Sequence, residues 1–152
     1  MGPEAPCLVY QLMINGSLED SLWLRKRSEP LTWLQRHNIA KGTAKGLQYL
    51  HTVSEIPLIH GNIKSANILL NQNLEPRIGD FGLAQEVPEV DSMKISKIHG
   101  IRPYLPLEYL QHRTLSTKTD TYSYGIVLFE LATGIPAYDD GRRSDKFLKD
   151  FI

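Results

Sequence analysis

Residues 60–67 read His-Gly-Asn-Ile-Lys-Ser-Ala-Asn, and the triplet Asp-Phe-Gly follows at residues 80–82. Farther along, Pro-Leu-Glu occupies residues 106–108, and Asp120 comes after it. Each group alone is more typical of a turn or a packed loop than of a catalytic site, but their combination in this order is not expected by accident. The stretch therefore predicts a functional polar loop, which the rest of the chain must hold in place.

Short apolar segments flank the polar stretch. Residues 57–59, 68–70 and 77–78 predict small hairpin strands, with a turn over residues 71–76. Residues 85–100 show no periodic pattern, which is typical of a mobile functional loop inside a compact domain. We expect the polar loop to lie among these strands.

The beginning of the chain predicts a strand and a helix. The apolar run at residues 7–13 ends at an Asn-Gly turn and is typical of a buried strand. Ser17 precedes Asp20 by three residues, a capping spacing that predicts a helix through about Arg27.

A second capping pair, Thr32 and Gln35, predicts a longer helix over residues 33–51. The spacing of its apolar residues is that of a helix with one face toward a core. The expected apolar face consists of Trp33, Ala40, Ala44, Leu47 and Leu50.

The last strong helix is predicted over residues 117–133. Thr117 and Asp120 are expected to cap it, and Gly134 and Pro136 to stop it. Because this helix is apolar on almost every side, we expect it to be central and buried.

Composition limits the class of protein. The 152 residues fit one domain, and 41% hydrophobic with 22% charged residues exclude a disordered or fibrous chain. Seventeen basic residues balance seventeen acidic ones, which gives no reason to expect a nucleic-acid partner. The single cysteine, Cys7, excludes an internal disulfide, and no zinc-ligand spacing is present. We expect no membrane span, no signal peptide and a cytoplasmic protein.

With these motifs in this order, the sequence resembles the protein kinase family, whose signature is a catalytic loop, a D-F-G metal site and an A-P-E triplet. Here the three read HGNIKSAN, DFG and PLE. Within the family the chain resembles the Pelle and interleukin-1-receptor-associated kinases. The runs that fit this branch are LVYQLM at residues 8–13, LTW at 31–33, HG in place of HR, and IGDFGLA at 78–84.

The resemblance implies an α+β, mainly helical fold, the large C-terminal lobe of a kinase, lacking the small lobe and the last helices. It covers a partial kinase domain over residues 1–152. The implied parts are a hinge at 8–16, a catalytic loop at 60–67, an activation segment at 80–108 and a central helix at 117–133.

The resemblance also implies phosphate transfer from ATP to a protein, with Mg²⁺. Asn67 and Asp80 would ligate the metal, because hard oxygen ligands suit this ion. Lys64 would steady the transferred phosphate, as in serine/threonine kinases, while His60 and Phe81 would pack and hold the loop in register. Adenine would contact the remaining cofactor-binding residues, Tyr10, Met13 and Leu69. The implied partners are ATP, a protein substrate and signalling adaptor proteins.

The resemblance fails close to the chemistry. Asn62 stands where the family places the aspartate that accepts the proton of the attacking hydroxyl. An asparagine amide is not basic near neutral pH, and losing a positioned base typically costs about 10² to 10⁴-fold in rate. Ile101 replaces the family's threonine, Leu107 the proline of A-P-E, and Gly61 the arginine that receives an activation-loop phosphate. We therefore predict impaired catalysis.

Three interpretations stay open. The chain contains no G-x-G-x-x-G loop and no V-A-I-K lysine, so it would be part of a serine/threonine kinase domain. Alternatively it is a pseudokinase scaffold of receptor-proximal signalling that binds ATP without turnover, which Asn62 and Ile101 favour. The third possibility is a truncated fragment without a function of its own.

Overall fold

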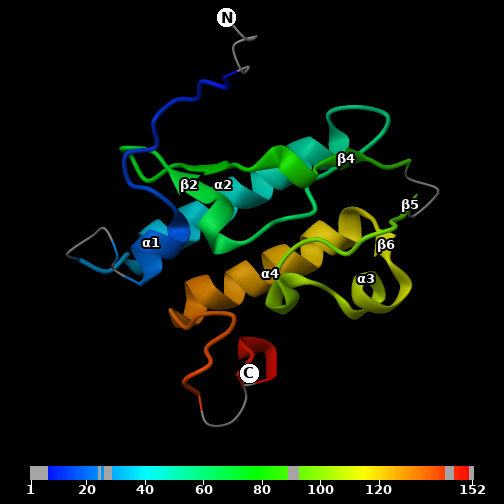
Figure 1. Cartoon of the computed structure of the whole chain (residues 1–152). Helices are drawn as coiled ribbons and strands as arrows, with labels where there is room; N and C mark the ends of the chain where they lie inside the picture. Colours follow the sequence, from blue (N-terminus) through cyan, green and yellow to red (C-terminus); the bar gives the residue numbers. More distant parts are fainter. Residues whose placement is uncertain (1–6, 24, 26–28, 89–92, 143–145, 151–152) are drawn as a thin grey trace, which may run out of the picture.

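The computed structural model describes residues 7–23, 25, 29–88, 93–142 and 146–150. Two long helices, α2 (Trp33–Thr52) and α4 (Thr117–Thr133), run through the molecule, with α2 above α4 in Figure 1. The Tyr124 hydroxyl on α4 donates to the Ala40 carbonyl on α2 at 2.7 Å. This contact helps to fix the two helices against each other.

The other elements are short. They are α1 (Leu18–Leu22), α3 (Leu107–His112), β1 (Leu58–Ile59), β2 (Ile68–Leu70), β3 (Pro76–Ile78), β4 (Gln85–Glu86), β5 (Met93–Lys94) and β6 (Thr114–Leu115). Within the described ranges the strands form three antiparallel pairs, β1–β4, β2–β3 and β5–β6. Single 3₁₀ turns lie at Ser65–Asn67, Phe81–Leu83, Arg102–Tyr104 and Leu148–Asp150. This is the mainly helical α+β architecture that the sequence predicts.

Helix α2 begins at the predicted capping box. The Thr32 backbone N–H donates to Gln35 Oε1 at 2.9 Å, and the Gln35 N–H donates to Thr32 Oγ1 at 3.3 Å. The predicted apolar face is partly wrong, because Trp33 is 71% exposed. Trp33 lies to one side of the stripe that α2 buries, given a turn of 3.6 residues. The buried residues are Ile39, Thr43, Leu47 and Leu50.

Helix α4 has the predicted bounds but a different cap. Ser116, rather than Thr117, is the N-cap residue, and its N–H donates to Thr119 Oγ1 at 3.2 Å. Asp120 does not cap the helix, because its carboxylate is buried and directed at another loop. The helix is central, although Leu128 and Phe129 are each 39% exposed, so it is not buried on almost every side.

The strand pairing fixes where the polar loop lies. The segment 60–67 joins β1 to β2, and the triplet at 80–82 joins β3 to β4. Because β1 pairs with β4 and β2 pairs with β3, the two connections must lie side by side. Two residues distant in sequence, Asn67 and Gly79, accordingly share a backbone hydrogen bond of 2.8 Å.

The region predicted to lack structure contains two strands. Residues 85–86 form β4, and residues 93–94 form β5, which pairs with β6 across Met93 and Leu115. Two-residue strands are too short to show an alternating pattern, so sequence periodicity could not reveal them. Residues 89–92 lie outside the described part of the chain.

The predicted strand at residues 7–13 is wrong. These residues form no strand, and Leu8, Val9 and Leu12 are 81%, 94% and 84% exposed. No strand of the described chain pairs with them. Without a sheet to join, the segment forms no strand and its apolar side chains stay exposed to solvent. Helix α1 forms with its predicted Ser17 cap but ends at Leu22, before the predicted end at Arg27, which lies outside the described residues.

Two apolar clusters hold the elements together. The larger one joins α1, α2, β2 and α4 around residues that include Leu18, Ile39, Ile68 and Val127, each fully buried. The smaller one, around Ile59, packs β1 against the segment that carries α3, β5 and β6. Among the described helices none is both long and apolar enough to cross a bilayer.

Candidate active site

The loop at 60–67 is held by a buried carboxylate from α4. Asp120 is 1% exposed, and its Oδ2 accepts the His60 backbone N–H at 2.8 Å, while Oδ1 accepts the Gly61 N–H at 2.8 Å. His51 Nε2 donates to the same Oδ2 at 2.9 Å. Gly61 has φ +73°, a conformation that glycine adopts without steric cost. The buried carboxylate therefore fixes the start of the loop.

His60 is buried and neutral in a defined tautomer. Its Nε2 lies 2.9 Å from the Gly79 carbonyl, which can only accept, so Nε2 carries the proton. Its Nδ1 accepts the Asn62 backbone N–H at 3.2 Å. Burial lowers the pKa of His60, although the Gly79 carbonyl and the charges of Asp120 and Asp80 oppose the shift. The neutral ring can therefore bond to both segments of the site.

The structure brings together Asn62, Asn67 and Asp80. Asn62 Nδ2 donates to Asp80 Oδ2 at 3.0 Å, and Asn67 Nδ2 lies 3.4 Å from the same oxygen. Asn67 Nδ2 also donates to the Asn62 carbonyl at 2.9 Å. One carboxylate and two amides thus form a single polar cluster at the junction of the two connections.

Asp80 and Phe81 are placed by the turn that follows β3. Asp80 has φ +61°, in the left-handed region that few residues other than glycine adopt. The Phe81 ring meets the His60 ring edge-on, with centroids 4.9 Å apart. The two rings therefore pack the triplet against the loop at 60–67.

Lys64 lies in the same loop and is half-buried. Within the described residues its ammonium makes no hydrogen bond or ion pair. Lys64, Asn62 and Ile101 line one small hollow, so the segment that follows Gly100 lies beside Asn62 and Lys64. The Ile101 side chain is 50% exposed and, being a hydrocarbon, offers no hydrogen bond there. Leu107 lies away from the cluster, 63% exposed in the first turn of α3.

The sequence model of protein tyrosine and serine/threonine kinases matches residues 1–149. The chain belongs to the protein kinase family. Pelle-like serine/threonine-protein kinase pik-1 of Caenorhabditis elegans is 50% identical over 145 residues, 91% of this chain and 30% of that protein. Serine/threonine-protein kinase pelle of Drosophila melanogaster is 54% identical over 134 residues, 85% of this chain and 27% of that protein.

Interleukin-1 receptor-associated kinase 1 of Mus musculus is 42% identical over 155 residues, 96% of this chain and 22% of that protein. The resemblance to the Pelle and interleukin-1-receptor-associated branch is therefore confirmed. The chain spans less than a third of the length of these three relatives.

The predicted adenine contacts of this kinase domain lie in the N-terminal segment and on β2. Tyr10 is 79% exposed in the segment at 7–13. Met13 begins a turn that ends at Gly16. The Gly16 carbonyl accepts a hydrogen bond of 2.8 Å from the N–H of Leu70, which lies on β2. Leu69, on the same strand, lies against Gly79, where a Cβ would come within 3.1 Å of it. Their role in adenine binding stays a prediction.

The polar cluster has donors that fit one Mg²⁺ ion shared with phosphate. Asp80 offers the carboxylate, and Asn67 can offer its amide oxygen because its nitrogen is the atom that donates to Asn62 and Asp80. Mg²⁺ is commonly bound by one or two protein oxygens together with phosphates and water. No set of three or more His, Cys, Asp or Glu side chains that could form an all-protein cage occurs in the described ranges.

A buried network behind the hollow was not predicted. The Tyr104 hydroxyl donates to Glu130 Oε1 at 2.7 Å and lies 3.2 Å from Ser65 Oγ. The Ala137 N–H donates to the same Glu130 oxygen at 2.8 Å. Burial raises the pKa of both Glu130 and Tyr104. A glutamate within the apolar run of α4 was the signal that could have revealed this network.

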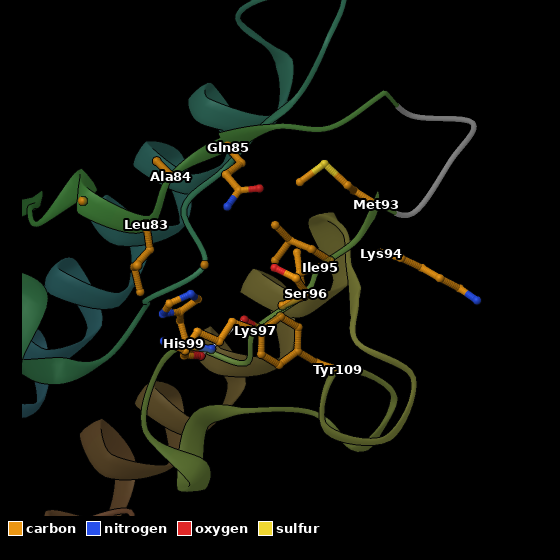
Figure 2. Close-up of a pocket in the computed structure, with 13 residues that line it drawn as sticks. Leu83, Ala84, Gln85, Met93, Lys94, Ile95, Ser96, Lys97, His99 and Tyr109 are labelled. Atoms are coloured by element: carbon orange, nitrogen blue, oxygen red, sulfur yellow. Dashed lines mark hydrogen bonds between the residues drawn. The ribbon is translucent and has the colours of Figure 1, made fainter.

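Figure 2 shows a separate cavity of about 510 Å³ between residues 83–85 and 93–99. The Lys94 side chain extends away from the cavity, and the Tyr109 ring lies at its edge. Gly61 also lines it, with no side chain to fill the space. The three residues of the polar cluster do not line this cavity, although Gly61 and Gly82 of the same two segments do, so it adjoins the candidate active site.

Proposed function

We propose that this chain belongs to a serine/threonine protein kinase of the Pelle type that binds ATP with Mg²⁺ and transfers phosphate only slowly. The observation that carries the proposal is the contact of Asn62 with Asp80. The family's metal-binding position is retained in Asp80, whereas the proton-accepting position holds an amide that donates to it.

The retained residues support nucleotide binding. Asp80 and Asn67 would hold the ion, which when bound neutralises the charge of the ATP phosphates. Lys64 has no competing partner among the described residues, and its ammonium is free to contact the transferred phosphate. Leu69, Met13 and Tyr10 would contact adenine. Their partial exposure in this chain leaves apolar surface for the base.

The changed residues support slow transfer. The Asn62 amide can orient a hydroxyl but cannot take its proton, which typically costs about 10² to 10⁴-fold in rate. Ile101 lines the hollow beside Asn62 and Lys64 and offers only a hydrocarbon surface. Positioning of the reactants alone still supports part of the rate.

The same observation favours a second function, a pseudokinase scaffold that binds ATP without turnover. In either case the natural partners would be a cytoplasmic protein substrate or signalling adaptor proteins. The name of the relative from Mus musculus, interleukin-1 receptor-associated kinase 1, is in line with receptor-proximal signalling. Both functions require an intact nucleotide site and differ only in turnover.

Nucleotide binding and phosphate transfer by the full-length protein test the proposal together. The matched negative control is Asp80→Ala, which removes the metal-binding carboxylate. Slow transfer that exceeds this control supports the kinase, and ATP binding with transfer no faster than the control supports the scaffold. Failure of the natural protein to bind ATP would contradict both.

A further inference from the structure

The Asn62 amide occupies one oxygen of the carboxylate that would hold the metal. Asn62 Nδ2 and Asn67 Nδ2 lie 3.0 Å and 3.4 Å from Asp80 Oδ2. A carboxylate oxygen has about two lone-pair sites, and two N–H groups fill them. Among the described residues no hydrogen bond reaches Asp80 Oδ1, and Gly82 leaves open space beside that oxygen. A cation could therefore use Oδ1 without competition but would have to displace amides from Oδ2.

The same hydrogen bonds hold a backbone that is costly to form. Asp80 has φ +61° and ψ +70°, in the left-handed region that residues with a Cβ seldom adopt, although aspartate does so more readily than most. Its neighbour Gly79 donates its N–H to the Asn67 carbonyl at 2.8 Å. Asp80 is thus held in its strained conformation from both sides by groups of the protein itself.

An aspartate at position 62 would reverse the interaction. Two carboxylates about 3 Å apart repel each other unless one is protonated or a cation lies nearby. The natural Asn62 replaces this repulsion with a hydrogen bond and removes one of the charges that would attract the cation. Asp80 is exposed to solvent, so both the ion and water can reach it.

We propose that Asn62 makes nucleotide binding by this domain less dependent on Mg²⁺ than an aspartate at position 62 would, because its amide already fills Asp80 Oδ2, one of the two carboxylate oxygens open to the ion. The inference rests on the proposed nucleotide-binding function and adds a property to it. It does not depend on whether phosphate is transferred.

The first test needs no nucleotide. Thermal unfolding of the full-length protein is followed in EDTA and in excess MgCl₂, for the natural sequence and for Asn62→Asp. We expect the midpoint of the natural protein to differ little between the two solutions. The Asn62→Asp variant should unfold at a lower temperature in EDTA and regain stability with Mg²⁺. A natural protein stabilised by Mg²⁺ as much as the variant would overturn the proposal.

The second test measures the affinity for a fluorescent ATP analogue, mant-ATP, with and without Mg²⁺. The Kd of the natural protein should change by less than about threefold, and that of Asn62→Asp by about tenfold or more. Equal dependence on Mg²⁺ in the two proteins would overturn this inference and leave nucleotide binding intact. If mant-ATP does not bind in either solution, the proposed function fails as well.

Two further variants separate the hydrogen bond from the charge. Asn62→Ala removes the amide without adding a carboxylate, and it should make binding more dependent on Mg²⁺ than in the natural protein. Asn38→Asp adds a charge at an exposed position of α2 and should change neither measurement. If Asn62→Ala kept the natural protein's weak dependence on Mg²⁺, the amide would not be its cause and the proposal would be wrong.

Discussion

Asp120 Oδ1 on the central helix α4 lies 2.8 Å from the backbone nitrogen of Gly61, 59 residues earlier in the chain. The contact means that the start of the loop at 60–67 is positioned through its main chain. Side chains in the loop can therefore change, as Asn62 has, without loss of the loop's position. The position of the loop therefore depends little on which side chain occupies position 62.

Loss of the Asp120 carboxylate should be strongly destabilising. Asp120→Ala leaves the buried N–H groups of His60 and Gly61 without acceptors, which should cost about 3 kcal/mol or more in the free energy of unfolding. Urea denaturation of the full-length protein measures the change. The exposed neighbour Thr121→Ala should change it by less than about 0.5 kcal/mol. Equal effects of the two variants would contradict the role given to Asp120.

A methyl group at Gly61 should be costly because of its backbone conformation alone. Gly61 has φ +73°, and a Cβ there would meet its nearest atom at 3.4 Å, an ordinary contact. Gly61→Ala should therefore lose roughly 1–2 kcal/mol of stability. The matched control is Gly125→Ala within α4, where a Cβ meets nothing within 4 Å and should stabilise by up to about 1 kcal/mol. The same sign of change in both variants would contradict this account.

The hydroxyl of Tyr104 should contribute more to stability than an exposed hydroxyl. Tyr104→Phe leaves the buried Glu130 carboxylate with one donor fewer and should cost about 1–3 kcal/mol. The control is Tyr138→Phe, which removes a hydroxyl bound to exposed Asp140 at 3.1 Å and should cost less than about 0.5 kcal/mol. Chemical denaturation compares them, and similar losses would show that Tyr104 and Glu130 are not coupled as described.

Stability should fall as the pH drops below the usual histidine pKa of 6.5, because burial lowers the pKa of His60. Below 6.5 the unfolded chain takes up a proton that the folded chain excludes, which lowers stability by at most about 1.4 kcal/mol per pH unit for one group. Protonation would also remove the acceptor of the Asn62 N–H. An NMR titration of the His60 ring checks this, and a midpoint above 6.5 would contradict it.

Local signals in the sequence predicted the parts of the fold that depend on neighbouring residues. The Thr32–Gln35 capping box and the stop at Gly134 gave correct helix ends, because such signals act within one turn. The strand expected at residues 7–13 failed, since a strand needs a partner that no local pattern can supply. Residues 85–100 failed for a related reason, because β4 and β5 exist only through pairing with β1 and β6.

The residues of the candidate site that belong to sequence motifs could be predicted. Lys64, Asn67 and Asp80 were expected to share one cleft, with Asn62 at the proton-accepting position. The structure places Asn62 and Asn67 in contact with Asp80, and among the described residues no hydrogen bond or ion pair joins the Lys64 ammonium to them. The donor role of the Asn62 amide was not expected, because it depends on the distance to Asp80 after folding. The buried pair of Tyr104 and Glu130 was also missed, because a hydrogen bond between residues far apart in sequence has no local pattern.

The rate of phosphate transfer by Asn62→Asp, relative to the natural full-length protein, tests the central claim most directly. Transfer from γ-labelled ATP to a protein substrate is measured for both under identical conditions, with Asp80→Ala as the background. If Asn62 is the cause of slow chemistry, the variant should be faster by about 10²-fold or more. A natural protein that already transfers phosphate as fast as Asn62→Asp would contradict the account.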